Sequence, residues 1–333
     1  MERLLGLTLS SFFITAILLV PFIDFLYKIK LKRQAQVTKD MFNKHTPIFD
    51  KFNAHKVGTP FGGGLLIILV TAIWTLWAYG ILNIQVKPAE AFIIFFTFIS
   101  FGLLGFYDDL KKLTQKKGGF FGLRFRHKFI IQWVLALIIA SVFYVQLQYD
   151  FVFIHGYGIL NIGLLFIPFA AIMIVSFANA FNITDGLDGL ASGLFLICLV
   201  AFLIINKNLD LPLGIFLAIL LGSVAAFLYF NIYKARLWLG DVGSLSLGAT
   251  LAVIGLLTGK ALALIIIGGI FVIEVSSSLI QLLGKKYLHK KILPVAPFHL
   301  YLQKKGWEEP KIVMRAWVVG FFLGILGIFI ALI

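Results

Sequence analysis

The chain repeats one feature that constrains its fold more than any other, an apolar stretch about as long as a membrane span. A helix needs about 20 consecutive apolar residues to cross the hydrocarbon core of a bilayer. Ten such windows follow one another, at 6–27, 61–82, 89–107, 129–147, 160–180, 188–205, 211–230, 244–259, 261–283 and 316–333. Only 13% of the 333 residues are charged, where about 25% is usual in soluble domains. We therefore predict an all-α polytopic integral membrane helical bundle of about ten transmembrane helices, forming one domain over residues 1–333.

The distribution of basic residues predicts which ends of the spans face the cytoplasm. The chain holds 29 Lys and Arg against 15 Asp and Glu, a net charge of +14. The loops after the first, third, fifth, seventh and ninth windows hold 25 of the 29, and the other side has Arg3, Lys87, Lys207 and Lys260. Cytoplasmic loops of membrane proteins collect Lys and Arg. We predict that both termini face outward. Because topology accounts for the positive charge, we predict no nucleic-acid partner.

Acidic side chains lie beside glycines in three of the predicted cytoplasmic segments. The segments are GFYDD at 105–109, NAFNITDGLDG at 179–189 and GDVGS at 240–244. Their five acids are Asp108, Asp109, Asp185, Asp188 and Asp241. An Asp at a helix start is commonly a cap that accepts backbone N–H bonds, and this structural role stays open for Asp185 and Asp241. Ionisable groups at membrane depth are costly and usually functional, so five acids on one side predict a functional site there.

Such a set of residues is typical of chemistry on phosphates. Mg²⁺ usually binds one or two carboxylates and completes its shell with waters and substrate phosphates. Glycines let the backbone approach phosphate oxygens, helix N-termini attract anions, and lysines neutralise the remaining charge. The chain has no P-loop, no G-x-S-x-G turn and no H-E-x-x-H motif, which argues against an ATPase, a serine hydrolase and a zinc protease. We predict phosphoryl chemistry at the inner membrane surface, with Mg²⁺ as cofactor.

Two other classes of protein stay open on these residues alone. Glu274 lies within the ninth window, and an intramembrane acid of this kind is typical of a proton-coupled transporter. Transporters, however, bind their substrates near the midplane between broken helices, whereas the five acids lie at one face. A non-catalytic membrane scaffold is the other alternative, and it predicts that all five acids are dispensable.

Taken together, these stretches resemble the polyprenyl-phosphate N-acetylhexosamine-1-phosphate transferase family. The similarity rests, in chain order, on Asp108-Asp109, NAFNITDGLDGLASG at 179–193, GDVGSLSLG at 240–248 and the loop with His299. Three further stretches are most similar to the branch whose donor sugar carries a pentapeptide. They are KVGTPFGGG at 56–64, RHKFIIQ at 126–132 and APFHLYLQKKGWEEPKIVMRAW at 296–317. The similarity runs from about residue 50 to the C-terminus.

The resemblance implies a ten-span bundle in the inner membrane of a bacterium, with both termini outside and a cytoplasmic active site. It implies Mg²⁺-dependent transfer of phospho-N-acetylmuramoyl-pentapeptide from its UDP-sugar donor to undecaprenyl phosphate, a polyprenyl phosphate lipid, with release of UMP. The product would be the first lipid-linked precursor of peptidoglycan. UDP-N-acetylglucosamine stays open as the donor, because the family's usual three histidines are here His299-Leu300-Tyr301. A homodimer also stays open, as does a two-step route through an aspartyl adduct.

Roles for individual residues follow from the same resemblance. Asp108, Asp109, Asp241 and His299 would be catalytic, and Asp241 would also ligate Mg²⁺. The residues that would bind substrate are Lys56, Lys128, Asn182, Asp185, Asp188 and Asn231. A phosphate monoester has a second pKa of about 6, so the lipid nucleophile is largely ionised at neutral pH and a strong general base is not required.

Overall fold

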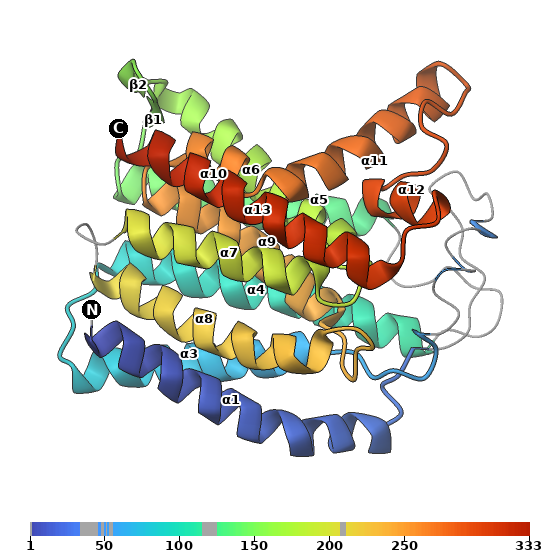
Figure 1. Ribbon diagram of the computed structural model, residues 1–333. Coiled ribbons are helices and arrows are strands. Elements are labelled where there is room, and N and C mark those ends of the chain that lie inside the picture. Colours follow the sequence, from blue (N-terminus) through green and yellow to red (C-terminus); the bar gives the residue numbers. More distant parts are fainter. Residues whose placement is uncertain are drawn as a thin grey trace.

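Helices make up nearly all the regular structure of the described chain. The computed structural model describes residues 2–33, 56–114, 125–206 and 211–333, with the single positions 46, 47, 50 and 52. The helices in Figure 1 are α1 (Glu2–Lys28), α3 (Gly63–Ile81), α4 (Pro88–Thr114), α5 (Phe125–Gln146), α6 (Phe166–Thr184), α7 (Leu190–Ile205), α8 (Leu211–Asn231), α9 (Gly240–Leu257), α10 (Ala261–Ile267), α11 (Gly269–Tyr287), α12 (Phe298–Lys304) and α13 (Glu309–Leu332). Each of the ten predicted windows overlaps at least one of these helices.

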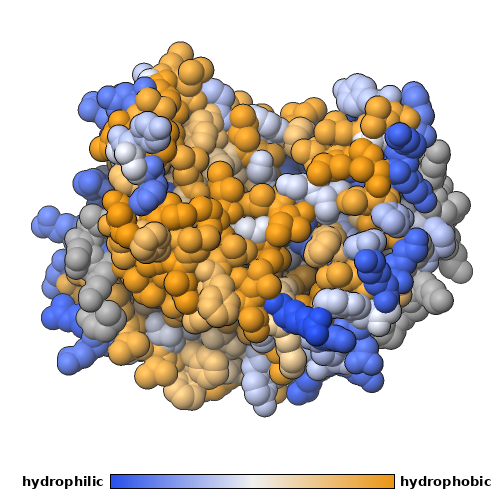
Figure 2. All heavy atoms as spheres, turned by 45° about the horizontal axis from the view of Figure 1, so that its top comes forward, coloured by the Kyte–Doolittle hydropathy of each residue, from blue (hydrophilic) through white to orange (hydrophobic). Residues whose placement is uncertain are grey.

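Most of these helices are suited to a membrane. Among the described residues, eight helices are long and apolar enough to cross a bilayer. The pair α10 and α11 passes the same test as one broken span, and α7, with 16 residues, is shorter. Figure 2 shows apolar residues over the middle of the molecule and hydrophilic residues towards both ends. The prediction of an all-α, multi-pass membrane protein is confirmed.

Figure 1 places the N-terminus and the C-terminus at the same end of the bundle, and α12 at the other end. This arrangement fits an even number of crossings. Some of the basic residues behind the predicted orientation lie outside the described residues, namely Lys39, Lys44, Lys51, Lys116, Lys117, Arg124 and Lys207. Which end faces the cytoplasm therefore stays a prediction from the charge distribution.

The helix α9 runs through the centre of the bundle. Every residue from Val242 to Leu256 is buried, and α3, α4 and α6 pack against this helix. Its first turn meets α4 at Gly105, where a Cβ atom would collide with the main chain of Asp241. A residue without a side chain is therefore needed at position 105, and this close approach brings the acidic end of α4 beside the start of α9.

The predicted span at 261–283 is wrong in one respect, because it is not continuous. The helices α10 and α11 meet at Gly268 with a bend of 82°. Two consecutive glycines, Gly268 and Gly269, stand at the break, and glycine weakens a helix interior. In Figure 1, α11 consequently leans away from the other helices.

Two further details differ from the sequence prediction. The helix α4 continues to Thr114, so Asp108 and Asp109 lie within its last turns and not in a loop. A short hairpin precedes α6, formed by β1 (Phe151–Ile154) and β2 (Gly158–Asn161) in antiparallel register, with Phe151 opposite Asn161. The alternation of apolar residues around a glycine-containing turn is a hairpin signal that a search for long apolar windows overlooks.

Candidate active site

Three of the predicted acids meet two lysines at the end of the bundle remote from the termini. We call Asp108, Asp109, Lys112, Lys128 and Asp241 the aspartate–lysine cluster. Lys112 Nζ lies 3.2 Å from Asp108 Oδ2 and 3.1 Å from Asp109 Oδ1. The same atom lies 2.9 Å from Asp241 Oδ1. Lys128 Nζ lies 3.2 Å from Asp108 Oδ2 and also pairs with Asp241 Oδ2. Residues of α4, α5 and α9 thus converge on one charged group.

The start of α9 is held by Asp109 of the neighbouring helix. The first N–H groups of a helix have no partner within it, and Leu239 supplies no side-chain cap. The Val242 N–H instead donates to Asp109 Oδ2 at 3.1 Å. The positive end of the helix dipole also favours a carboxylate there. The cap therefore comes from Asp109, and the Asp241 carboxylate is turned to the two lysines.

Asn182 and Asp185 extend the cluster along the end of α6. Asn182 Nδ2 donates to Asp241 Oδ1 at 3.1 Å and to Ser244 Oγ at 2.7 Å. Asp185 follows three residues later, which places it on the same face of the helix end. Burial raises the pKa of the Asp185 carboxyl well above its usual value, and the nearby negative charge of Asp241 raises it further. Asp185 therefore lies between the aspartate–lysine cluster and a second charged group.

That second group, which we call the Lys56 network, consists of Lys56, Asp188 and Glu309. Lys56 Nζ donates to Glu309 Oε1 at 2.6 Å and lies 3.3 Å from Asp188 Oδ1. All three residues are buried, with exposed fractions of 3%, 3% and 6%. Buried charges are costly unless they are paired, so the three side chains depend on one another. The sequence-predicted residues Lys56 and Asp188 thus lie together beside the aspartate–lysine cluster.

Asn231 is engaged with the backbone next to this network. Its Oδ1 accepts hydrogen bonds from the Gly189 N–H at 3.1 Å and from Ser192 Oγ at 2.8 Å. Its Nδ2 donates to the Leu237 carbonyl at 3.0 Å. Asn231 therefore joins the end of α8 to the start of α7 and holds the turn formed by residues 185–189.

His299 packs against the same turn. Its Nδ1 lies 3.1 Å from Glu274 Oε2, and its backbone N–H donates to Glu274 Oε1 at 3.1 Å. A Cβ atom on Gly186 would lie 2.6 Å from His299 Nε2, so the imidazole packs directly against the turn. Glu274, the acid that suggested a transporter, is thus the partner of His299 at the end of the bundle that holds the cluster.

Sequence reasoning missed four residues that contribute to this region, namely Lys112, Ser244, Glu274 and Glu309. Lys112 follows Asp108 by four residues, a spacing that brings two side chains together on a helix and was a usable signal. Ser244 stands in the quoted GDVGS segment. Glu309 lies in the quoted WEEPK stretch, and its contact with Lys56 crosses 253 positions of the sequence. Local spacing carries no information about a contact of that range.

The arrangement also bears on which residues can hold a metal ion. Among the described residues, no three or more His, Cys, Asp or Glu side chains are grouped to hold one. Asp108 and Asp241 come close, but Lys112 and Lys128 stand between their oxygens. Magnesium in phosphate sites needs only one or two carboxylates, because substrate phosphates and waters supply the other ligands. The donor set therefore fits a Mg²⁺ ion that is bound together with a diphosphate.

Known proteins resemble this chain over nearly its whole length. Residues 91–259 match the family model described as glycosyl transferase family 4. The chain is 35% identical over 325 residues to the phospho-N-acetylmuramoyl-pentapeptide-transferase of Geobacillus thermodenitrificans (strain NG80-2), covering 96% of this chain and 95% of that protein. The chain is 33% identical over 342 residues to the protein of the same name from Aquifex aeolicus (strain VF5), covering 96% of this chain and 90% of that protein. The chain belongs to the phospho-N-acetylmuramoyl-pentapeptide transferase family.

Membership of this family makes the chain a membrane-bound transferase of sugar phosphates. The glycosyl transferase family 4 match contains the aspartate–lysine cluster, Asn182 and the 185–189 turn. Lys56, Glu274 and His299 lie outside that match but inside the region shared with the full-length phospho-N-acetylmuramoyl-pentapeptide transferases. Lys56 and His299 contact the 185–189 turn, and Glu274 contacts His299, so the two parts of the chain form one region.

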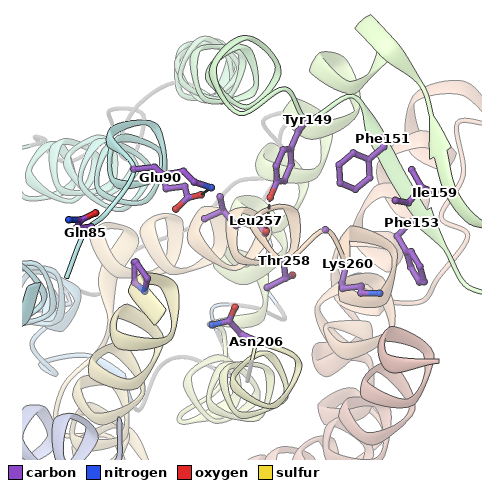
Figure 3. Close-up of a pocket in the computed structure, with 13 residues that line it drawn as sticks. Gln85, Glu90, Tyr149, Phe151, Phe153, Ile159, Asn206, Leu257, Thr258 and Lys260 are labelled. Atoms are coloured by element: carbon purple, nitrogen blue, oxygen red, sulfur yellow. Dashed lines mark hydrogen bonds and ion pairs between the residues drawn. The ribbon is translucent and has the colours of Figure 1, made fainter. Parts of the chain in front are cut away.

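A separate cavity of about 590 Å³ lies at the opposite end of the bundle (Figure 3). Its walls come from the hairpin, the start of α4 and the linker between α9 and α10. Figure 3 shows Tyr149 on one side of the cavity and Lys260 beside Phe153 on another. The Tyr149 hydroxyl donates to the Leu257 carbonyl at 3.0 Å. The sequence-predicted site residues do not line this cavity. The candidate active site is therefore the charged region at the other end.

Proposed function

We propose that this protein transfers phospho-N-acetylmuramoyl-pentapeptide from its UDP donor to undecaprenyl phosphate and releases UMP. The similarity to phospho-N-acetylmuramoyl-pentapeptide transferases, which extends over nearly the full length of both chains, carries this proposal. The site supports it, because carboxylates and lysines gathered at one end of a membrane bundle suit a reaction between a water-soluble diphosphate and a lipid phosphate. The product is a lipid-linked precursor of peptidoglycan.

In this reaction an oxygen of the lipid phosphate forms a bond to the β-phosphorus of the donor. The bond between that phosphorus and the bridging oxygen breaks, and UMP leaves with the electron pair. Phosphoryl transfer depends mainly on positioning and on charge stabilisation. Lys112 and Lys128 can supply positive charge to the phosphates, and Asp108 and Asp109 hold both lysines in place. The lipid phosphate is already largely ionised near neutral pH, so Asp108 need not be a strong base.

Asp241 is the residue that we propose as the Mg²⁺ ligand. Its carboxylate already faces cationic groups, since Lys112 and Lys128 both pair with it. When bound, Mg²⁺ orients a diphosphate and stabilises the charge that develops on the leaving phosphate. Asn182 donates to the same carboxylate and so fixes its orientation.

The donor side of the site is assigned to the turn and its neighbours. Asp185 lies next to the cluster, Lys56 pairs with Asp188 of the turn, and Asn231 accepts a hydrogen bond from the Gly189 N–H. His299, which packs against Gly186, completes this side. We assign these residues to donor binding and orientation, and we assign the aspartate–lysine cluster to the reacting phosphates.

The same proposal places the site at the cytoplasmic face of a bacterial inner membrane. The loops on that side hold most of the basic residues of the chain, which is the usual cytoplasmic pattern. A cytoplasmic site also suits a nucleotide donor, which is water-soluble and cannot cross the bilayer unaided.

The test is an assay of UMP release by the purified protein. UDP-N-acetylmuramoyl-pentapeptide and UDP-N-acetylglucosamine are offered in parallel with undecaprenyl phosphate, each with Mg²⁺ and with EDTA. We expect release that depends on Mg²⁺ and on the lipid, with preference for the first donor. Preference for UDP-N-acetylglucosamine would overturn the donor assignment, and no release from either donor would overturn the transferase activity.

A further inference from the structure

Glu309 is a buried acid to which the proposed reaction assigns no role. It is the first residue of α13, and its neighbour Glu308 is exposed. One oxygen, Oε1, accepts hydrogen bonds at 2.6 Å from Lys56 Nζ and at 2.6 Å from the Asp188 N–H. A single carboxylate oxygen thus joins the start of α13, the segment before α3 and the 185–189 turn.

Lys56 is surrounded by acceptors that belong to the protein. An ammonium group has three N–H donors. Glu309 Oε1 lies at 2.6 Å, the Gly186 carbonyl at 3.1 Å and Asp188 Oδ1 at 3.3 Å. The ring of Trp238 covers the same ammonium group at 4.5 Å from its centroid. Two hydrogen bonds, to Glu309 and to the Gly186 carbonyl, and the ion pair with Asp188 hold the ammonium group, so Lys56 links Glu309 to the turn.

The turn is therefore contacted both by the Lys56 network and by His299. Lys56 and Glu309 contact it at Gly186 and Asp188, and the His299 imidazole packs against Gly186. Asp185 stands at the start of this turn, three residues after Asn182, which contacts Asp241. A shift of the turn moves Asp185 relative to the aspartate–lysine cluster.

We infer that Glu309 is a positioning residue for the sugar-nucleotide donor. Its carboxylate fixes Lys56 and the Asp188 N–H, and through them it sets where the 185–189 turn presents Asp185. The residue acts on donor binding and leaves the lipid phosphate untouched, because its Oε1 binds Lys56 and the Asp188 N–H, which both lie outside the aspartate–lysine cluster. This inference rests on the proposed function for the identity of the two substrates.

The test separates the two substrates by their KM values. In the UMP-release assay, one substrate is varied while the other is saturating, with the full-length protein in detergent. Glu309→Gln removes the charge with little change in shape, and we expect the donor KM to rise about tenfold while the lipid KM stays within about twofold. Glu308→Gln is the matched control, because it makes the same charge change at the adjacent exposed position. We expect both KM values to be unchanged in that control.

Three further variants test the same inference. Glu309→Asp retains the charge on a shorter side chain, and we expect a smaller rise in the donor KM. If Glu309→Gln does not fold, this variant carries the comparison of the two KM values. Because Glu309 acts in part through Lys56, we expect the rise in the donor KM of the double variant Lys56→Met/Glu309→Gln to be smaller than the product of the rises in the two single variants, since contacting residues are non-additive.

The outcomes distinguish this inference from the proposed function. Wild-type protein that releases no UMP refutes the function. Active wild-type protein with an unchanged donor KM in Glu309→Gln refutes the positioning role alone. Equal rises in the donor and lipid KM values refute it as well, because they describe a general loss of structure. Fully additive effects in the double variant also refute it, because they show that Glu309 acts independently of Lys56.

Discussion

Replacing Asp241 with Asn tests the centre of the candidate site most directly. The side chain keeps its shape but loses its charge. Asp241 Oδ1 lies 2.9 Å from Lys112 Nζ and accepts a hydrogen bond from Asn182 Nδ2 at 3.1 Å, and Asp241 Oδ2 pairs with Lys128 Nζ. Three donors therefore converge on this carboxylate. Under the proposal, the same carboxylate holds Mg²⁺ at the reacting phosphates. We expect Asp241→Asn to abolish most of the turnover.

The structure sets the expected size of two separate effects. Loss of a group that stabilises charge in the transition state costs about 10²- to 10³-fold in kcat, and we expect a loss in that range. The effect on folding is smaller. After the substitution, Lys112 Nζ still has its ion pairs with Asp108 at 3.2 Å and Asp109 at 3.1 Å. Lys128 Nζ still has its ion pair with Asp108 at 3.2 Å. No lysine is left buried without a carboxylate, so we expect a loss in the free energy of unfolding of about 1.5–3 kcal/mol, the value of one hydrogen bond to a charged group.

The assay measures UMP release and thermal unfolding on the same preparation. Asp24→Asn is the matched control, because Asp24 is exposed on α1 and the charge change is the same. We expect the control to keep its activity and its unfolding temperature. A folded Asp241→Asn protein whose kcat/KM lies within about threefold of wild type would show that Asp241 neither binds metal nor serves the transition state.

Four other outcomes are expected. Lys128→Ala raises the KM for the donor or the lipid phosphate about tenfold, and unchanged values for both substrates contradict a role in phosphate binding. Glu274→Gln lowers kcat/KM about tenfold by releasing the His299 ring, whereas full activity would show that the pair is dispensable. Gly105→Ala lowers the free energy of unfolding by about 1–3 kcal/mol in a thermal melt, because the added methyl meets the main chain of Asp241, and Gly6→Ala, which meets open space, does not. EDTA stops UMP release and added Mg²⁺ restores it, and turnover that persists in EDTA contradicts the assignment of the metal.

The general architecture of this protein could be predicted from its sequence. The length of an apolar window and the charge of a loop are local properties, and both are visible in a single chain. They sufficed for the membrane class and for the approximate positions of the eight described helices that are long and apolar enough to cross a bilayer. They failed at Gly268, because the bend between α10 and α11 depends on how the two helices pack and not on hydropathy.

The site was predictable only in part. The acids Asp108, Asp109, Asp185 and Asp241 stand out because charged residues are costly at membrane depth. Their partners do not stand out in the same way. Glu274 suggested a transporter until the fold placed it 3.1 Å from His299.

By itself, the sequence determined that this protein lies in a membrane and that its acidic motifs fall on one side of the bundle. Tertiary structure alone decided which side chains meet. It placed Asp109 as the cap of α9, set two lysines among three carboxylates and brought Glu309 to Lys56 across 253 positions. The physical reason is that an apolar span is favoured in lipid wherever it lies along the chain, whereas a buried charge is stable only beside a partner that the packing of distant helices supplies.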